Sequence, residues 1–264
     1  MTLHVIDRVA VDDDGEGDAV FCIHGLGGSS NTFAPLMNTL SHFRVLRIDL
    51  PGSARSQRAE GEISMQRFTE TVQSICSRLN IARAHFVGHS LGTIVCQHVA
   101  VVAPALVRSL TLFGPLMAPP DGARIALRVR GARARSEGLT GMQDIAVALV
   151  QASTSTDTRQ HLPVAVAFVR ESLLRQEGEC YGRTCEALAE AQAADVQRIN
   201  VPLLLVTGEE DVVAPPQAVR AMAEKFHSTR NARVVLLPRC GHWTPIERPE
   251  ECARELRDFL AAQR

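Results

Sequence analysis

Residues 88–92, which read Gly-His-Ser-Leu-Gly, form a G-x-S-x-G pattern whose central hydroxyl can serve as a nucleophile. Residues 84–87 before it predict a short buried strand, and residues 93–102 after it predict an apolar helix. A serine held on a sharp strand-to-helix turn projects its hydroxyl above the sheet, and the first N–H groups of the helix point to the same place. This context indicates covalent catalysis by Ser90.

A serine nucleophile needs a base, and His242 is the best candidate among the nine histidines. It follows the apolar strand residues 234–237 late in the chain, and Gly241 lets the loop turn back over the sheet. His24 and His89 lie inside the motifs themselves and are predicted either to line the pocket or to support the residues that do. The other six are predicted to pack in the core or to lie at the surface: His4, His42, His85, His98, His161 and His227.

The predicted acid is Asp211, in the loop after the apolar strand 203–207. A carboxylate there can accept the imidazole N–H, fix its tautomer and stabilise the imidazolium. The spacing G-x-x-D-x-x-x-P favours Asp211 over Glu209 and Glu210. The alternative is an acid after the preceding strand, but that loop has no carboxylate before Asp121.

Two backbone N–H groups are predicted to hold the negative oxygen that forms during acyl transfer. One belongs to Leu91, directly after the nucleophile, and the other to Leu26, in the glycine-rich loop 24–28 that follows strand 19–23. Each such donor contributes about 10²–10³ in rate. The substrate pocket is predicted to contain four further residues: His24, Gly25, His89 and Trp243.

With these motifs in the order Ser90, Asp211, His242, the chain resembles the α/β-hydrolase-fold serine hydrolases, in particular the esterase and 3-oxoadipate enol-lactonase branch. The resemblance implies a mostly parallel sheet covered by helices on both faces. Ala54 stands where the family often has glycine, and Phe33 where it often has tryptophan. Other matching residues are His24-Gly25-Leu26-Gly27, Asp49-Leu50-Pro51-Gly52, Pro202, Pro245 and Glu247.

Strands alternate with helices along most of the chain, which predicts a parallel α/β sheet. Residues 3–9 are predicted to form a single strand, with one antiparallel edge strand missing or reduced. The acidic residues 12–18 are predicted to form a solvated hairpin turn. Further strands are expected at 19–23, 44–49, 84–88, 106–113, 203–207 and 233–237, and helices at 65–79, 218–226 and 250–262.

Residues 116–196 contain no convincing strand and are predicted to form a helical cap inserted after strand 6, between core residues 1–115 and 197–264. The predicted cap helices are 124–137, 141–152, 163–177 and 181–193. A run of arginines in the first helix is predicted to be a solvated face, because at about 100° per residue it spans more than half the circumference. The competing interpretation is a clamp for a substrate carboxylate. The run comprises Arg124, Arg128, Arg130, Arg133 and Arg135.

Composition narrows the class of partner. The net charge of −1 gives no electrostatic case for nucleic acid or an anionic membrane surface. No signal peptide or spanning run is visible, and the seven cysteines lack zinc-type spacing, so free thiols in the cytoplasm are expected. A small-molecule ester or lactone is the expected partner, with no metal or organic cofactor, and the oligomeric state is left open.

The expected reaction is hydrolysis of a carboxylic ester or lactone through an acyl-enzyme on Ser90. Dehalogenases and epoxide hydrolases of this fold use an aspartate at the elbow, so the serine excludes their route. One alternative is a carbon–carbon bond hydrolase acting on vinylogous 1,5-diketones with the same three residues. A remote alternative is a non-catalytic receptor that binds a ligand under the cap.

Overall fold

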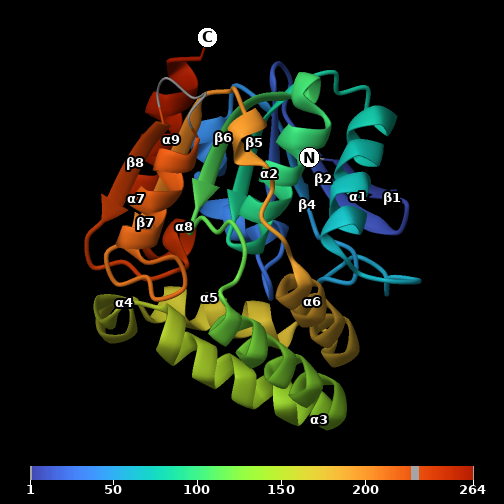
Figure 1. Cartoon of the computed structure of the whole chain (residues 1–264), viewed down its shortest axis with the longest axis vertical. Helices are drawn as coiled ribbons and strands as arrows, with labels where there is room; N and C mark the ends of the chain where they lie inside the picture. Colours follow the sequence, from blue (N-terminus) through green and yellow to red (C-terminus); the bar gives the residue numbers. More distant parts are fainter. Residues whose placement is uncertain (1, 227–231, 264) are drawn as a thin grey trace.

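An eight-stranded, mostly parallel sheet runs through the computed structural model, which describes residues 2–226 and 232–263 (Figure 1). The strand order is β1-β2-β4-β3-β5-β6-β7-β8; β1 and β2 are antiparallel to their neighbours, and the other pairs are parallel. The strands are β1 (Thr2–Ile6), β2 (Val9–Asp14), β3 (Ala19–Ile23), β4 (Arg44–Ile48), β5 (Ala84–His89), β6 (Val107–Phe113), β7 (Leu203–Gly208) and β8 (Ala232–Leu237). His227 lies outside the described residues.

Helices cover both faces of this sheet, as predicted. Strand β3 shows the alternation, because Phe21 and Ile23 pack with α1, α2 and α7 on one face, while Val20 and Cys22 pack with η1 and α9 on the other. The helical elements of the core are α1 (Met65–Arg78), α2 (Leu91–Val102), α7 (Pro216–Lys225), α8 (Thr244–Glu247), α9 (Pro249–Ala261), and the 3-10 segments η1 (Ser30–Leu40), η2 (Pro104–Leu106) and η3 (Val196–Arg198).

The prediction of a single strand over residues 3–9, with an edge strand missing, is wrong. The chain instead makes a hairpin of β1 and β2 that supplies the antiparallel edge. Asp7 and Arg8 form the turn, and both have left-handed φ, 49° and 71°. Two-residue turns with positive φ at both positions are normally marked by Asn-Gly or Asp-Gly, and this turn lacks that glycine.

The acidic segment 12–18 is not simply a solvated turn. Its first three residues complete β2, and the turn begins only at Gly15. Asp12 is 2% exposed and forms ion pairs with Arg47 and Arg55. The charge is buried because basic side chains from β4 and the loop after it face it across the sheet edge, which the local sequence does not reveal.

The chain between β6 and β7 is helical, and its helices lie together at one end of the sheet, in the lower part of Figure 1. They are α3 (Asp121–Ser153), α4 (Thr156–His161), α5 (Pro163–Leu174) and α6 (Gly178–Glu190). Both helices predicted at 124–137 and 141–152 are present within α3, and the non-helical residue Gly138, with φ 56° and ψ −127°, separates them. The division between core and cap at residues 116 and 196 stays a prediction. No helix within 2–226 and 232–263 is long and apolar enough to cross a membrane.

Candidate active site

Ser90 occupies the single residue between β5 and α2, with φ 51° and ψ −118°. A serine rarely adopts this left-handed conformation, and such strain clusters at functional sites. Gly92 is required beside it, because a Cβ there would lie 2.0 Å from the carbonyl oxygen of Ile23. Gly88 is similarly crowded, with a Cβ position 2.8 Å from the backbone of Gly92. The two glycines therefore let strand, turn and helix pack closely around the serine.

The loops after β3, β5, β7 and β8 meet at the carboxyl edge of the sheet, because these strands are parallel. They bring Ser90, Asp211 and His242 into one line. His242 Nε2 lies 2.8 Å from Ser90 Oγ, and His242 Nδ1 lies 2.8 Å from Asp211 Oδ2. Since a carboxylate only accepts, Nδ1 carries the proton and the neutral ring offers Nε2 as acceptor to the serine hydroxyl.

Asp211 is held ionised within this line. Burial by itself raises the pKa of Asp211, but the electrostatic attraction of His242 and the hydrogen bonds that the carboxylate accepts hold that pKa below its ordinary value. Its Oδ1 accepts from the N–H groups of Val213 and Ala214, each at 2.8 Å. The competitor Glu210 is turned away and accepts from the Thr156 N–H instead.

The two predicted oxyanion donors lie beside Ser90. Leu91 begins α2, so its N–H has no intrahelical acceptor, and Leu26 lines the same cavity as Ser90. In the part of the chain that the structure describes, neither N–H donates to a protein acceptor. Gly25 lets the loop that holds Leu26 pack closely against Ser90, because a Cβ at Gly25 would lie 2.7 Å from Ser90 Cβ.

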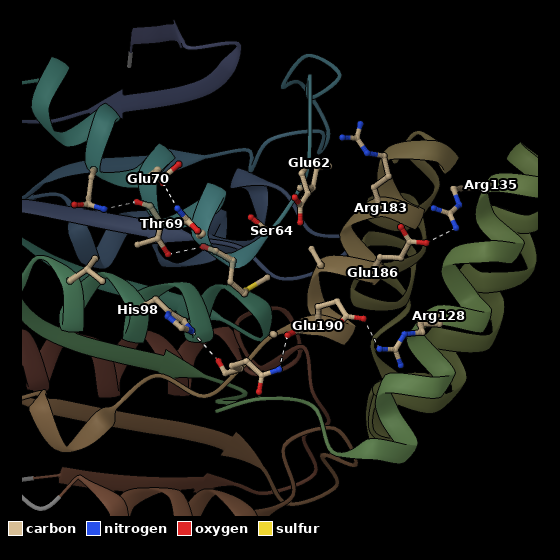
Figure 2. A pocket seen from close by; sticks show the side chains of 18 of the residues that line it. Glu62, Ser64, Thr69, Glu70, His98, Arg128, Arg135, Arg183, Glu186 and Glu190 are labelled. Atoms are coloured by element: carbon tan, nitrogen blue, oxygen red, sulfur yellow. Dashed lines mark hydrogen bonds and ion pairs between the residues drawn. The ribbon is translucent and has the colours of Figure 1, made fainter.

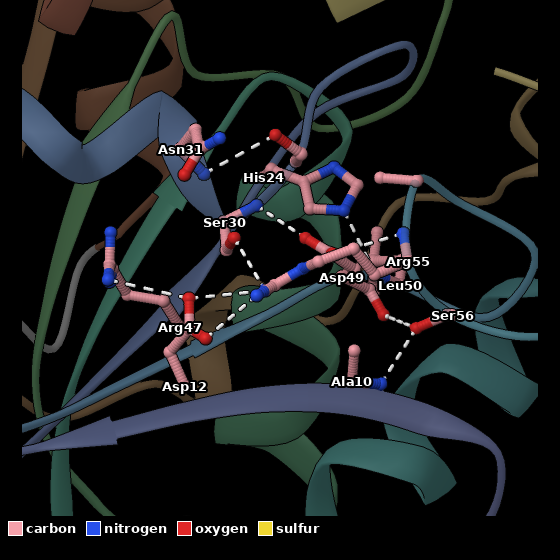
Figure 3. A network of polar contacts seen from close by, with 12 residues as sticks. Ala10, Asp12, His24, Ser30, Asn31, Arg47, Asp49, Leu50, Arg55 and Ser56 are labelled. Atoms are coloured by element: carbon pink, nitrogen blue, oxygen red, sulfur yellow. Dashed lines mark hydrogen bonds and ion pairs between the residues drawn. The ribbon is translucent and has the colours of Figure 1, made fainter. Parts of the chain in front are cut away.

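A buried ionic network lies behind the Leu26 loop (Figure 3). Asp49 is fully buried and accepts from the Ser30 N–H at 2.7 Å and from Arg55 Nε at 2.7 Å. The Arg55 guanidinium also donates from Nη1 to Asp12 Oδ1 at 2.9 Å. Burial by itself raises the pKa of Asp49, but electrostatic attraction to His24 and Arg55 and the hydrogen bonds donated to the carboxylate hold that pKa below its usual range. The network thereby fixes the chain on both sides of the loop.

His24 and His89 lie behind the cavity and do not line it, which matches the supporting position that was one of the two predicted for them. His24 accepts the Leu50 N–H at Nε2, 2.9 Å, and donates from Nδ1 to the Gly25 carbonyl, 2.7 Å. His89 Nε2 donates to the His242 carbonyl at 2.9 Å. Burial lowers the pKa of both rings, that of His89 to about 3, so both stay neutral and position the neighbouring loops.

Glu247 is a positioning residue whose role sequence reasoning missed. Its carboxylate is 1% exposed and accepts four hydrogen bonds of 2.8–3.0 Å. In addition, the His242 N–H donates to the Ser153 carbonyl at 2.8 Å. The histidine loop is therefore tied to the segment that joins α3 and α4. The only available sequence signal was a glutamate five residues after the histidine. The four donors are the N–H groups of Gly241, Trp243 and Ser155 and the hydroxyl of Thr158.

Ser90 and His242 open into a cavity of about 270 Å³ between the sheet and the helices α3 and α6. This is near the lower end of the range for ligand sites, which suits a small substrate. Trp243 is one of the residues that line this cavity, and Gly25 is not. Most of the wall is apolar and includes Leu116, Ala123, Leu127, Leu149, Leu188 and Val212.

The arginines of α3 do not converge on one point, but they are not uniformly a solvated face. Arg130 lines the cavity that holds Ser90, so the prediction is wrong for this residue. Helical spacing gives the angles between side chains, but it does not say which side faces the core. The others contact protein oxygens: Arg124 the carbonyls of Ala189 and Ala191, Arg128 the carboxylate of Glu190, Arg133 those of Glu137 and Asp144, and Arg135 that of Glu186.

A larger groove of about 1110 Å³ lies between α1 and α2 on one side and α3 and α6 on the other (Figure 2). Its charges are paired across it, Arg128 with Glu190 at 2.6 Å and Arg135 with Glu186 at 2.5 Å. Neither Ser90 nor His242 lines it. In residues 2–226 and 232–263, no three His, Cys, Asp or Glu side chains are grouped to hold a metal ion. The smaller cavity is therefore the candidate active site.

Comparison with known proteins agrees with this geometry. The family model described as alpha/beta hydrolase fold matches residues 18–249. The enol-lactonase of Burkholderia xenovorans LB400 superposes with a TM-score of 0.89 and 27% identity, covering 98% of this chain and 100% of that one. The 2-hydroxymuconate semialdehyde hydrolase of Pseudomonas putida is 27% identical over 96% of this chain and 91% of its own length.

A further relative is the dihydrolipoyllysine-residue acetyltransferase component of the acetoin cleaving system of Pseudomonas putida. It is 30% identical over 92% of this chain, but the matched region spans only 64% of that protein.

Proposed function

The chain belongs to the α/β-hydrolase family, and on this premise we propose that it cleaves a carboxylic ester or lactone through an acyl-enzyme on Ser90. The observation that carries the proposal is the hydrogen-bonded line from Asp211 through His242 to Ser90, with 2.8 Å at each step. The 27% identity to an enol-lactonase of nearly the same fold supports ester or lactone chemistry.

In the proposed mechanism, His242 accepts the Ser90 proton as the hydroxyl attacks the carbonyl carbon. The N–H groups of Leu91 and Leu26 hold the oxyanion, and His242 then protonates the leaving alkoxide. Water activated by the same imidazole hydrolyses the acyl-enzyme. Residues 116–196 serve as a cap that excludes water from this reaction.

Carbon–carbon bond hydrolysis is the second candidate, because it can use the same three residues. The relative named 2-hydroxymuconate semialdehyde hydrolase supports it. A receptor without turnover is the third, and it predicts ligand binding with no product.

We also propose that the protein acts in the cytoplasm on a small-molecule substrate. The seven cysteines are free thiols, and all are buried. Free buried thiols are typical of a reducing compartment.

The test is a substrate panel of p-nitrophenyl esters of graded chain length, lactones and vinylogous 1,5-diketones. We expect turnover of esters or lactones, and labelling of Ser90 by a fluorophosphonate. Ser90→Ala should lower kcat by about 10⁴ or more and abolish the label. Ser136→Ala, at an exposed position on α3, is the control and should retain both. Turnover of the diketones alone would favour the second candidate, and a labelled Ser90→Ala variant would contradict the assignment.

A further inference from the structure

Arg130 brings a cation into the candidate active-site cavity, and no acidic side chain among the described residues pairs with it. It projects from α3, and its Nε is buried without a hydrogen-bond partner among the described residues. Of the described residues that line the cavity, Arg130 is the only one with a fixed charge, and none is Asp or Glu. Burying a cation without a counter-charge is costly, so the position calls for an explanation.

Tyr181 supplies a second unpartnered polar group to the same cavity. It lies on α6 and is 2% exposed, and its hydroxyl is buried with no partner in the described part of the chain. Burial raises the pKa of the phenol well above its usual range, so the hydroxyl stays a neutral donor at physiological pH. The ring lies against the oxyanion loop, since a Cβ on Gly27 would come 3.4 Å from Tyr181 Cε2.

A pair of glycines brings these two side chains together. Gly131 follows Arg130 and Gly182 follows Tyr181, and α3 and α6 are in contact at this pair. A Cβ at Gly131 would lie 2.9 Å from the Gly182 carbonyl oxygen, and one at Gly182 would lie 2.7 Å from that of Gly131. Larger residues would separate the helices and with them the guanidinium and the hydroxyl.

No protein group nearby neutralises Arg130. The Cys185 thiol lies beside both Arg130 and Tyr181, but burial raises its pKa, so it stays uncharged. On α3 itself, the positions three and four residues away hold Leu127, Ala126, Arg133 and Ala134, and none is acidic. The glutamates of α6 that face α3 are engaged elsewhere, Glu186 by Arg135 and Glu190 by Arg128.

We infer that Arg130 and Tyr181 bind a carboxylate of the substrate, so that the enzyme acts on small esters or lactones whose acyl part carries that group. This inference rests on the proposed function, since it places the anion in the cavity that holds Ser90. A guanidinium offers a planar pair of N–H donors that matches a carboxylate, and the phenol adds a third donor. The apolar wall between accommodates a short carbon chain. Bound substrate thereby supplies the counter-charge that the protein lacks.

The experiment compares two esters that differ only at the end of the chain: mono-p-nitrophenyl glutarate and p-nitrophenyl pentanoate. We expect wild type to prefer the acidic ester in kcat/KM by about tenfold or more. Arg130→Gln should abolish that preference, mainly by raising KM for the glutarate ester, so that kcat/KM falls much more for the glutarate ester than for the pentanoate. Tyr181→Phe should weaken the preference less, and Arg128→Gln, on the same helix but outside the cavity, should leave it unchanged.

Each alternative outcome is distinct. An equal loss on both esters in Arg130→Gln would show a structural role and overturn the inference, while the proposed function would stand. A wild-type preference for the pentanoate would also overturn it. If wild type cleaves neither these two esters nor any ester or lactone of the panel, the proposed function fails. Calorimetry with glutarate then decides the inference: binding lost in Arg130→Gln supports the anion site, and no binding to wild type overturns it. Tyr181→Phe covers the case in which Arg130→Gln does not fold, because it removes only an unpartnered hydroxyl.

Discussion

Replacing Asp211 with asparagine tests the proposed triad with almost no change of shape. The asparagine oxygen can keep the two N–H donors of Val213 and Ala214 at the Oδ1 position. Its NH₂ group then replaces Oδ2, which accepts from His242 Nδ1 at 2.8 Å and from the Thr207 hydroxyl at 3.0 Å. The Thr207 hydroxyl also lies 2.7 Å from the Ala214 carbonyl, so it can donate there and accept from the new amide.

His242 has no such freedom. Facing an N–H donor, Nδ1 must become an acceptor, and the ring proton moves to Nε2, which lies 2.8 Å from Ser90 Oγ. The ring then donates to the serine and no longer accepts its proton. Loss of the correct tautomer costs about 10⁴ in kcat, or about 5.4 kcal/mol of transition-state stabilisation. The fold should lose much less, about 1–3 kcal/mol, because most of the hydrogen bonds survive in neutral form.

Steady-state kinetics on a p-nitrophenyl ester, with urea unfolding of the same samples, would measure both quantities. Glu210→Gln is the matched control, because this carboxylate lies in the same loop but accepts from the Thr156 N–H, at 2.9 Å, and not from His242. It should cost less than tenfold in kcat. The reasoning would be refuted by an Asp211→Asn variant within tenfold of wild type, or by a Glu210→Gln variant of equal severity.

Three further substitutions test other parts of the structure. Glu247→Gln places an amide N–H against a buried backbone N–H. The free energy of unfolding in urea should therefore fall by about 1–3 kcal/mol, and kcat should fall more than KM changes. An unfolding free energy equal to that of wild type would contradict the four hydrogen bonds to Glu247. Ala54→Gly should stabilise the fold by about 0.5–1 kcal/mol in the same assay, because Ala54 has φ 47° and glycine relieves that strain. The greater backbone freedom of glycine in the unfolded chain offsets part of this gain. A loss of stability would contradict the prediction. Burial lowers the pKa of His85 to about 4 against about 6.5 when unfolded, so the unfolded chain binds the proton more readily and stability falls as pH drops from about 6.5 to 4. His85→Gln should reduce the slope of unfolding free energy against pH in that window by up to about 1.4 kcal/mol per unit, and an unchanged slope would show that the ring is not held neutral.

The loops that carry the catalytic residues were predictable from sequence because each directly follows an apolar strand. Ser90 follows a short apolar strand and precedes an apolar helix, while Asp211 and His242 each follow an apolar strand. Parallel strands deliver their carboxyl ends to one edge, so the sequence pattern implies proximity. The order of the strands, and therefore which loops meet, comes from the sheet itself.

The features that sequence reasoning missed all depend on what lies across space. The turn at Asp7 and Arg8 carries no glycine to announce its left-handed conformation. The local sequence predicts that Asp12 is exposed to solvent, but ion pairs with Arg47 on β4 and with Arg55 compensate its burial. Arg130 belongs to a run of similar residues, and only the packing of α3 on α6 distinguishes the one that enters the cavity. The sequence pattern shows which type of side chain stands at each position, but only the packed structure shows which residues that side chain contacts.

The hydrogen bonds around Glu247 also determine where the sequences of two relatives can be joined in a chimera. Glu247 binds Ser155 and Thr158, and the His242 N–H binds the Ser153 carbonyl, so the end of α3 and the start of α4 form one unit with the histidine loop. A chimera in which foreign sequence replaces residues 153–158 would separate the histidine loop from the backbone that orients it. The natural junction for exchanging specificity lies after α4, leaving α5 and α6 free to vary, and Tyr181 would travel with them.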